Sequence, residues 1–260
     1  MQNFKSLRFT TEQKRVEDVF TNLPPPRPSN ALSGWGGYGG GAAATSAPVS
    51  MASYYNASGG CFSGDSLVYK LAGDGCWVAV MMQQLQPGDT VRCCEIDMES
   101  GRWQPQQQQL TQSEVVCVVK LPYQGELYAV NDSLRLTPYH PVVTLQQGNG
   151  NGAQPLFPCE VGVQTAAVDG FVYDIVLRNR GLVQCASSAG ARGELLLAAT
   201  FGHRCTVGKF QHDYFGTEAV VNDLRRHPGW ESGFVELGDY LYLRNDDGTV
   251  KSMCFSPILA

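Results

Sequence analysis

Three residues of this 260-residue chain supply the chemical groups of an acyl transfer. Cys61 follows Gly59 and Gly60, and glycine adopts unusual backbone angles and leaves its carbonyl sterically open. Thr137 and His140 lie three residues apart in "LTPYHPV", and imidazole is the side chain best suited to move a proton near neutral pH. A thiol, an accessible carbonyl and an imidazole are the parts of an acyl transfer. The fold has to bring them together.

Short β-type runs fill the chain from residue 61 onward. They are rich in Val, Leu, Tyr and Thr, and turn residues such as "AGDG", "QPGD" and "LPYQG" separate them. The runs cover residues 65–71, 77–85, 89–96, 113–121, 125–131, 134–138, 140–145 and 171–177. Many short strands with few helical stretches predict an all-β fold, wound into a compact sandwich or barrel-like body.

The two ends of the chain differ in character. Residues 11–23 fit a short amphipathic helix that "PPPRP" ends, and a Gly/Ala/Ser tract that reads as a flexible linker follows. After residue 205, "GTEAVVNDLRRHPGW" predicts a helix stopped by Pro228, and "ELGDYLYLRNDDGTV" predicts a hairpin that turns on "NDDG". The polar segments 104–112 and 146–154 are expected to be surface loops.

Composition narrows the function classes. A formal charge of −5 without a basic run gives no footprint for nucleic acid or an anionic membrane surface. The N-terminus lacks an apolar signal core and no segment reaches the roughly 18 apolar residues of a membrane span. Nine cysteines at irregular spacings without a CxxC pair indicate reduced thiols in the cytoplasm, with no metal site and no cofactor.

The motifs together resemble the Hint domain that Hedgehog C-terminal domains and inteins share. They are "GGCFSGDSLV", "LQPGDTV", "LRLTPYHPVV" and "VYDIVL", in this order. The "YYN…GGCF" start and the distal "GTEAVVNDL…PGW" are closer still to the Hint modules of eukaryotic proteins that carry von Willebrand A domains. The resemblance covers roughly residues 50 to 237. It implies a flexible N-terminal segment at 1–60, an autoprocessing Hint domain at 61–205 and a C-terminal extension at 206–260.

The resemblance also implies roles for individual residues. Cys61 would attack the Gly60 carbonyl and convert the Gly60–Cys61 amide into a thioester by an N-to-S acyl shift. His140 would protonate the departing Cys61 nitrogen, and Thr137 would hold the scissile group in a reactive geometry. The upstream segment is the substrate, and water, a thiol or another small nucleophile would resolve the thioester.

Where an intein ends in His-Asn followed by Cys, Ser or Thr, this chain reads His203-Arg204-Cys205. Arginine forms no succinimide, so the resemblance implies N-terminal cleavage or transfer without protein splicing. His203 would assist, and Cys205 as an acyl acceptor and Asp174 in "VYDIV" as a supporting group are secondary candidates. Lys120 stands where Hedgehog domains carry the acidic residue that activates a sterol, which argues against sterol transfer.

Two other functions stay open at this point. Cys, His and an acidic partner would also serve a thiol hydrolase that acts in trans, although such an enzyme needs no Gly-Gly before its own cysteine. A Hint fold without activity could act as a protein-interaction module, and the intact Cys61, Thr137 and His140 set argues against that loss.

Overall fold

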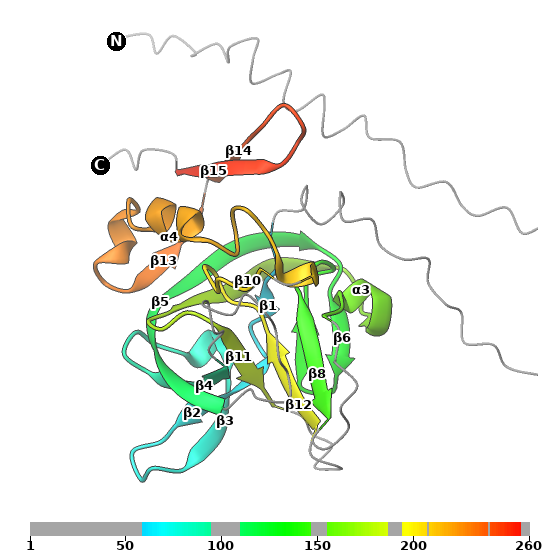
Figure 1. The fold of residues 1–260 in the computed structure, drawn as a ribbon, viewed down its shortest axis with the longest axis vertical. Helices are drawn as coiled ribbons and strands as arrows, with labels where there is room; N and C mark the ends of the chain where they lie inside the picture. The colour runs from blue at the N-terminus through cyan, green and yellow to red at the C-terminus, as the bar shows by residue number, and fades with distance from the viewer. Residues whose placement is uncertain are drawn as a thin grey trace, which may run out of the picture. The chain divides into compact units, whose positions relative to one another are not determined.

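A computed structural model describes residues 59–94, 110–146, 155–186, 194–206, 208–238 and 240–255 (Figure 1). The chain divides into two units, 1–45 and 46–260, and all described residues belong to the second. The helix predicted at 11–23, the linker and most of the two predicted polar loops lie outside the described residues.

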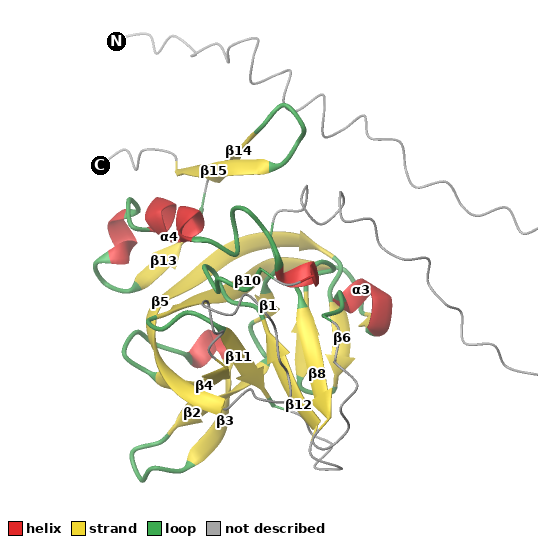
Figure 2. Cartoon of the chain, in the orientation of Figure 1, coloured by secondary structure: helices red, strands yellow, loops and turns green. Residues whose placement is uncertain are grey.

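Strands make up about half of the described residues and far exceed the helices, as Figure 2 shows, so the predicted all-β fold class is confirmed. The larger strands are β2 (Leu67–Leu71), β3 (Trp77–Met81), β4 (Thr90–Cys94), β5 (Leu110–Gly125), β6 (Tyr128–Asn131), β8 (Val142–Gln146), β10 (Val168–Leu177), β11 (Leu182–Cys185), β12 (Glu194–Ala198), β14 (Tyr240–Arg244) and β15 (Val250–Phe255). The shorter ones are β1 (Phe62–Ser63), β7 (Leu134–Leu136), β9 (Val163–Gln164) and β13 (Phe234–Glu236). The helices are α3 (Pro158–Val161), α4 (Glu218–Leu224) and the 3-10 turns η1 (Met82–Gln84), η3 (Gly208–Phe210) and η4 (Pro228–Trp230). Among the described residues, none of these helices is long and apolar enough to cross a membrane.

A single strongly curved sheet joins thirteen of these strands, in the order β8-β12-β11-β2-β4-β5-β10-β1-β7-β6-β9 with β3 and β13 attached to β2 and β5. Its centre is the long antiparallel pair β5 and β10, which runs from the Val168–Gly125 pair to the Leu177–Val115 pair. Figure 1 shows both strands bending across the body. A bulge between Val176 and Leu177 interrupts their register, and bulges increase the bend of a strand.

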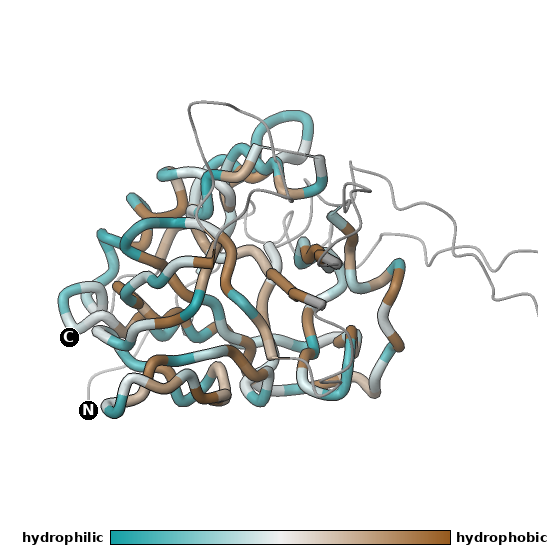
Figure 3. The backbone as a smooth tube through the Cα atoms, turned by 60° about the horizontal axis from the view of Figure 1, so that its bottom comes forward, coloured by the Kyte–Doolittle hydropathy of each residue, from teal (hydrophilic) through white to brown (hydrophobic). Residues whose placement is uncertain are grey.

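The sequence of β5 explains why it lies at the centre. Cys117, Val118 and Val119 are three consecutive residues with no exposed surface, so both faces of the strand are covered. Cys117 and Val119 pack in one hydrophobic cluster, and Val118 packs in a second cluster on the opposite face. Figure 3 shows the resulting contrast between apolar inner strands and hydrophilic turns. A run of β-branched residues without polar alternation is typical of a strand buried on both faces.

The first short strand, β1, fixes the position of Cys61. It pairs with β10 through Phe62 and Tyr173, and with β7 through Phe62 and Leu136. Because both pairs are antiparallel, the preceding residue, Cys61, comes level with the residues that follow Tyr173 and Leu136. β1 therefore brings together three segments that are far apart in the sequence.

The C-terminal segment packs onto the same body. β13 pairs in parallel with β5, from Phe234–Val118 to Glu236–Lys120. Helix α4 and the β14–β15 hairpin share the hydrophobic cluster that also contains Cys61. The buried Asp223 of α4 links them, because its Oδ2 accepts hydrogen bonds from the Tyr214 hydroxyl at 2.8 Å and from the Met253 backbone N–H at 2.6 Å.

Most predicted strands lie where the sequence indicated, and the helix ending before Pro228 and the hairpin turning on "NDDG" are both present. Strand β5 runs unbroken from Leu110 to Gly125, so the loop predicted at 110–112 and the turn predicted at "LPYQG" are both strand, and these two predictions were wrong. Strands β11, β12 and β13 were not predicted. Their sequences are short and apolar, and only their sheet partners distinguish them from buried coil.

We expect Asp223→Ala to lower the free energy of unfolding by about 1–3 kcal/mol, because it leaves the Tyr214 hydroxyl and the Met253 N–H buried without their acceptor. Urea unfolding followed by circular dichroism measures the change. Asn222→Ala, at the exposed neighbouring position, is the control and should change stability by less than about 0.5 kcal/mol. Equal effects of the two substitutions would show that Asp223 does not fasten the hairpin.

Candidate active site

Cys61 and Thr137 bind each other through two hydrogen bonds. The Cys61 backbone N–H donates to Thr137 Oγ1 at 2.8 Å, and the Thr137 N–H donates to the Cys61 carbonyl at 3.0 Å. Both residues are 4% exposed. The nitrogen of the Gly60–Cys61 amide is therefore held by the threonine hydroxyl, in a buried place.

His140 packs against Gly60, the residue on the other end of the same amide bond. It is fully buried, and its Nε2 lies 3.0 Å from the carbonyl oxygen of Ala199, so Nε2 carries the proton and donates. The second ring nitrogen, Nδ1, forms no hydrogen bond in the described structure. Burial lowers the pKa of His140 to about 3, although the backbone groups of Ala199 and Gly60 favour the protonated ring.

At both positions before Cys61, a neighbouring residue leaves room only for glycine. A Cβ atom on Gly60 would lie 2.5 Å from the Cα and 2.8 Å from the Cβ of His140. Gly59 has φ +91°, and a Cβ atom there would lie 3.0 Å from two ring carbons of Phe215. Backbone and side-chain atoms therefore pack directly against the Gly-Gly segment on two sides.

Asp174 lies near the Cys61 thiol in the same buried region. Its Oδ1 accepts hydrogen bonds from the N–H groups of Ile175 at 2.6 Å and Phe201 at 3.3 Å. Burial raises the pKa of Asp174 well above its usual value, despite these two donors. Burial, and secondarily the charge of Asp174, raises the pKa of the Cys61 thiol as well. Burial therefore favours the neutral form of both the thiol and the carboxyl.

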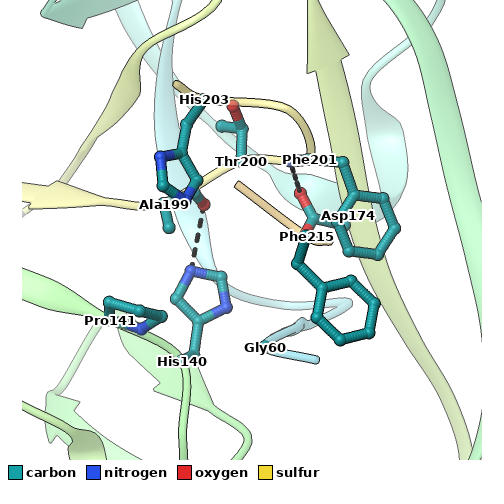
Figure 4. A pocket seen from close by; sticks show the side chains of 9 residues that line it. All are labelled: Gly60, His140, Pro141, Asp174, Ala199, Thr200, Phe201, His203 and Phe215. Carbon is teal, nitrogen blue, oxygen red and sulfur yellow. Dashed lines mark hydrogen bonds between the residues drawn. The ribbon is translucent and has the colours of Figure 1, made fainter. Parts of the chain in front are cut away.

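A small cavity that is partly open to solvent joins these residues, and its volume of about 10 Å³ gives room for roughly one water molecule. Figure 4 shows His140, His203 and the Ala199 carbonyl on one side, and Asp174 with the rings of Phe201 and Phe215 on the other. Gly60 lines the cavity too. The bond in front of Cys61 thus borders a space in which a small nucleophile fits.

The structure divides the remaining candidates. His203 borders the cavity, and its Nδ1 accepts the N–H of Cys205 at 2.9 Å. Burial, and then His140 and His212, lowers the pKa of His203 to about 3. Cys205 is 1% exposed and packs in a different hydrophobic cluster from Cys61, so the two thiols do not meet. Within the described residues, no group of three or more His, Cys, Asp or Glu side chains could hold a metal ion.

Lys120 points away from this site. Its Nζ binds Glu236 Oε1 of β13 at 2.8 Å and lies 3.9 Å from the centre of the Phe171 ring. A cation that is engaged by a carboxylate and an aromatic face is a packing element of the β5–β13 edge.

Sequence reasoning missed the contribution of the C-terminal segment to the site. Phe215 lines the cavity, and Gly216 packs against the His203 ring, since a Cβ atom there would lie 3.1 Å from its Cε1. His212 of the same segment is buried, and its Nδ1 accepts the N–H groups of Tyr214 and Phe215 at 3.1 Å each. Two adjacent aromatic residues followed by a glycine in "HDYFGT" are the one local signal that could have indicated this loop.

A family model described as a Hint-domain matches residues 60–251, well over half of the chain. The chain therefore belongs to the Hint-domain proteins, a family that is self-processing in general. Within this class it matches the group called Vint. None of the curated proteins that were compared with the chain matches it.

Among solved structures, the chain is similar to a DnaB intein from Synechocystis sp. PCC 6803. The two share 13% sequence identity, and the match covers 55% of this chain and 99% of that chain at a TM-score of 0.30. A likeness of this degree carries no argument about the site.

The buried histidines predict how stability depends on pH. The pKa of His140 and of His203 is about 3 in the folded chain, against an ordinary value of 6.5. Between these values the unfolded chain binds protons that the folded chain does not, so stability falls as the pH is lowered from about 6.5 toward 3. The raised pKa of Asp174 acts in the opposite direction, because the folded chain then keeps a proton that the unfolded chain releases.

We expect His140→Asn to reduce the slope of unfolding free energy against pH by about one proton between pH 4 and 6, about 1.4 kcal/mol per pH unit. Denaturant unfolding at a series of pH values measures the slope. His227→Asn, at a half-buried position outside the site, should change the slope less. An unchanged slope in His140→Asn would show that this imidazole is not held neutral by burial.

Proposed function

We propose that the chain cleaves itself at the Gly60–Cys61 bond, through a thioester formed by an N-to-S acyl shift. The observation that carries the proposal is the pair of hydrogen bonds between Cys61 and Thr137, with His140 packed against Gly60. The bond in front of the cysteine is thereby held between the residues that would act on it. Holding reacting groups in place is a large part of catalysis of this kind.

The shift moves one bond and one proton. Cys61 Sγ bonds to the Gly60 carbonyl carbon, the bond from that carbon to the Cys61 nitrogen breaks, and a proton passes from sulfur to nitrogen. His140 is neutral at rest, with its proton on Nε2 and with Nδ1 unprotonated, so it accepts the thiol proton at Nδ1 and delivers the same proton to the departing nitrogen. Because burial lowers the pKa of this ring, the protonated ring gives up its proton readily. Asp174, whose pKa burial raises, is assigned a supporting role beside the thiol.

Thr137 supports the step through its hydroxyl, which accepts the Cys61 N–H at 2.8 Å. This hydrogen bond fixes the nitrogen during the attack, and the hydroxyl remains next to the amine that forms. His203 is assigned an assisting role at the edge of the cavity. Water, a thiol or another small nucleophile then attacks the thioester, and residues 1–60 leave.

The burial of Cys61 favours this reading over a thiol hydrolase acting in trans. At 4% exposure, and with its pKa raised, the thiol is poorly suited to reach a foreign substrate. The Gly60–Cys61 bond is already next to the thiol in the fold, so no substrate has to enter the site from solution. The absence of splicing follows from Arg204, which cannot form a succinimide.

The finer relationships of the chain belong to the proposal as well. The "YYN…GGCF" and "GTEAVVNDL…PGW" segments support a place among Hint modules of proteins that carry von Willebrand A domains. The nine cysteines, which form no disulfide among the described residues, fit a reducing compartment such as the cytoplasm.

We expect the full chain, tagged at both ends and treated with dithiothreitol or hydroxylamine, to yield fragments 1–60 and 61–260. Intact mass spectrometry identifies the products. Cys61→Ala should abolish cleavage, and His140→Ala should slow it by roughly 10²–10⁴-fold, the usual contribution of a general acid or base. Cys185→Ala removes another buried thiol and is the control that should still cleave.

A wild-type chain that stays whole under these conditions contradicts the proposal and favours an interaction module. A cleavage rate that rises with protein concentration would favour a reaction in trans. Persistence of cleavage in Cys61→Ala would exclude the thioester.

The role of the Thr137 hydroxyl is tested by two conservative changes. Thr137→Val keeps the shape and removes the acceptor of the Cys61 N–H, so we expect cleavage to slow at least tenfold. Thr137→Ser keeps the acceptor and should retain most of the rate. Cleavage time courses at fixed hydroxylamine concentration compare them, and equal rates for the two variants would rule out the hydrogen bond as a contributor.

A further inference from the structure

We propose that Phe215 is a specificity-determining residue, which restricts position 59 of the departing segment to glycine. The inference rests on the proposed cleavage at Gly60–Cys61 and concerns which sequences can occupy the site. Phe215 lies 154 positions after Cys61, in the C-terminal segment. The selection would therefore be made by a part of the chain outside the residues that carry the chemistry.

The contact between Phe215 and Gly59 is close and leaves no room for a side chain. A Cβ atom on Gly59 would lie 3.0 Å from both Cε1 and Cζ of the ring and 3.2 Å from Cδ1. These distances are shorter than ordinary van der Waals contacts between carbon atoms, which lie near 3.5–4.0 Å. Either the ring or the backbone of residue 59 has to move before any other residue fits.

The ring cannot move easily, because other aromatic side chains surround it. Phe215 stacks on Phe201 with centroids 5.8 Å apart, and it contacts the rings of His212 at 4.7 Å and Tyr242 at 5.5 Å. Its own side chain is 5% exposed. A ring that is packed on several sides in this way keeps its rotamer.

The backbone of Phe215 is fixed as well. Its N–H donates to His212 Nδ1 at 3.1 Å, and its carbonyl accepts the N–H of Gly202 at 2.8 Å. The next residue, Gly216, accepts the N–H of Arg204 at 2.8 Å. These bonds join the loop to the segment that carries His203.

Ion pairs of Glu218 in α4 also hold the Phe215 loop to the segments that carry Arg180 and Arg204. Its carboxylate binds Arg180 through Nε at 2.9 Å and Nη2 at 3.1 Å, and Arg204 through Nη2 at 2.6 Å. Both arginines have positive φ, 62° and 63°, which is unusual for residues with side chains. A bidentate, part-buried pair such as that of Arg180 with Glu218 fixes geometry more firmly than a fully exposed ion pair.

Two separate features favour glycine at position 59, its backbone conformation and its contact with Phe215, and the experiment has to distinguish them. Its φ of +91° disfavours any side chain, whatever lies nearby. The contact with Phe215 is an additional restriction that depends on the ring. In a double-mutant cycle the backbone term is common to both backgrounds and cancels, so that the contact remains.

The test compares Gly59→Ala in the wild-type and Phe215→Ala backgrounds, as cleavage rates of the full chain in hydroxylamine. We expect Gly59→Ala to slow cleavage tenfold or more when Phe215 is present, and threefold or less when it is replaced by alanine. Gly60→Ala is the matched control. Its clash is with the backbone of His140, so its penalty should be the same in both backgrounds.

Equal penalties for Gly59→Ala in the two backgrounds, with a wild-type chain that cleaves, would overturn this inference and leave the proposed function standing. A wild-type chain that does not cleave overturns both. Where Phe215→Ala does not fold, Phe215→Leu replaces it, because leucine is smaller than phenylalanine but still fills most of the space. A smaller penalty for Gly59→Ala in the Phe215→Leu background than in the wild type is then the supporting result. A Gly60→Ala penalty that falls together with that of Gly59→Ala would show general loosening and would also count against the inference.

Discussion

The pairing of Cys61 with Thr137 is the constraint on which the rest of the site depends. The two hydrogen bonds continue the pairing of β1 with β7, and the same two-residue strand pairs with β10 on its other side. One short strand thus sets the thiol, the threonine hydroxyl and the Asp174 carboxyl in one place. A shift of one residue in this register would turn Cys61 to the opposite face and separate all three.

Burial is the main cause of the shifted pKa values in this site. Cys61 and Asp174 have raised pKa values and His140 has a lowered one, and burial is the first cause in each. Burial thus favours the neutral form of each of these groups. In buried surroundings a hydrogen bond is electrostatically stronger than in water, and a polar group without its partner is costly, so each group depends on its partners.

The sequence was sufficient for the fold class and for the candidate residues that the structure brings together around Gly60, because these signals are local. A cysteine after two glycines, Thr137 and His140 at fixed spacing and β-branched runs between turns are visible without partners. It was insufficient for the roles of Phe215, Glu218 and His212, whose importance comes from contacts across the fold. Strands β11 and β12 were not predicted for a similar reason, since "LVQC" and "ELLLA" can be assigned as strands only from their pairing with β4 and β8.

The two glycines before Cys61 are gripped by parts of the chain that lie far apart, His140 from the body and Phe215 from the C-terminal segment. Each glycine position is therefore sensitive to a different part of the fold. A side chain tolerated at residue 60 would indicate that the packing around His140 has changed, and one tolerated at residue 59 would indicate that the C-terminal segment no longer packs against it. Substitutions at the two glycines thus test the two parts of the fold independently.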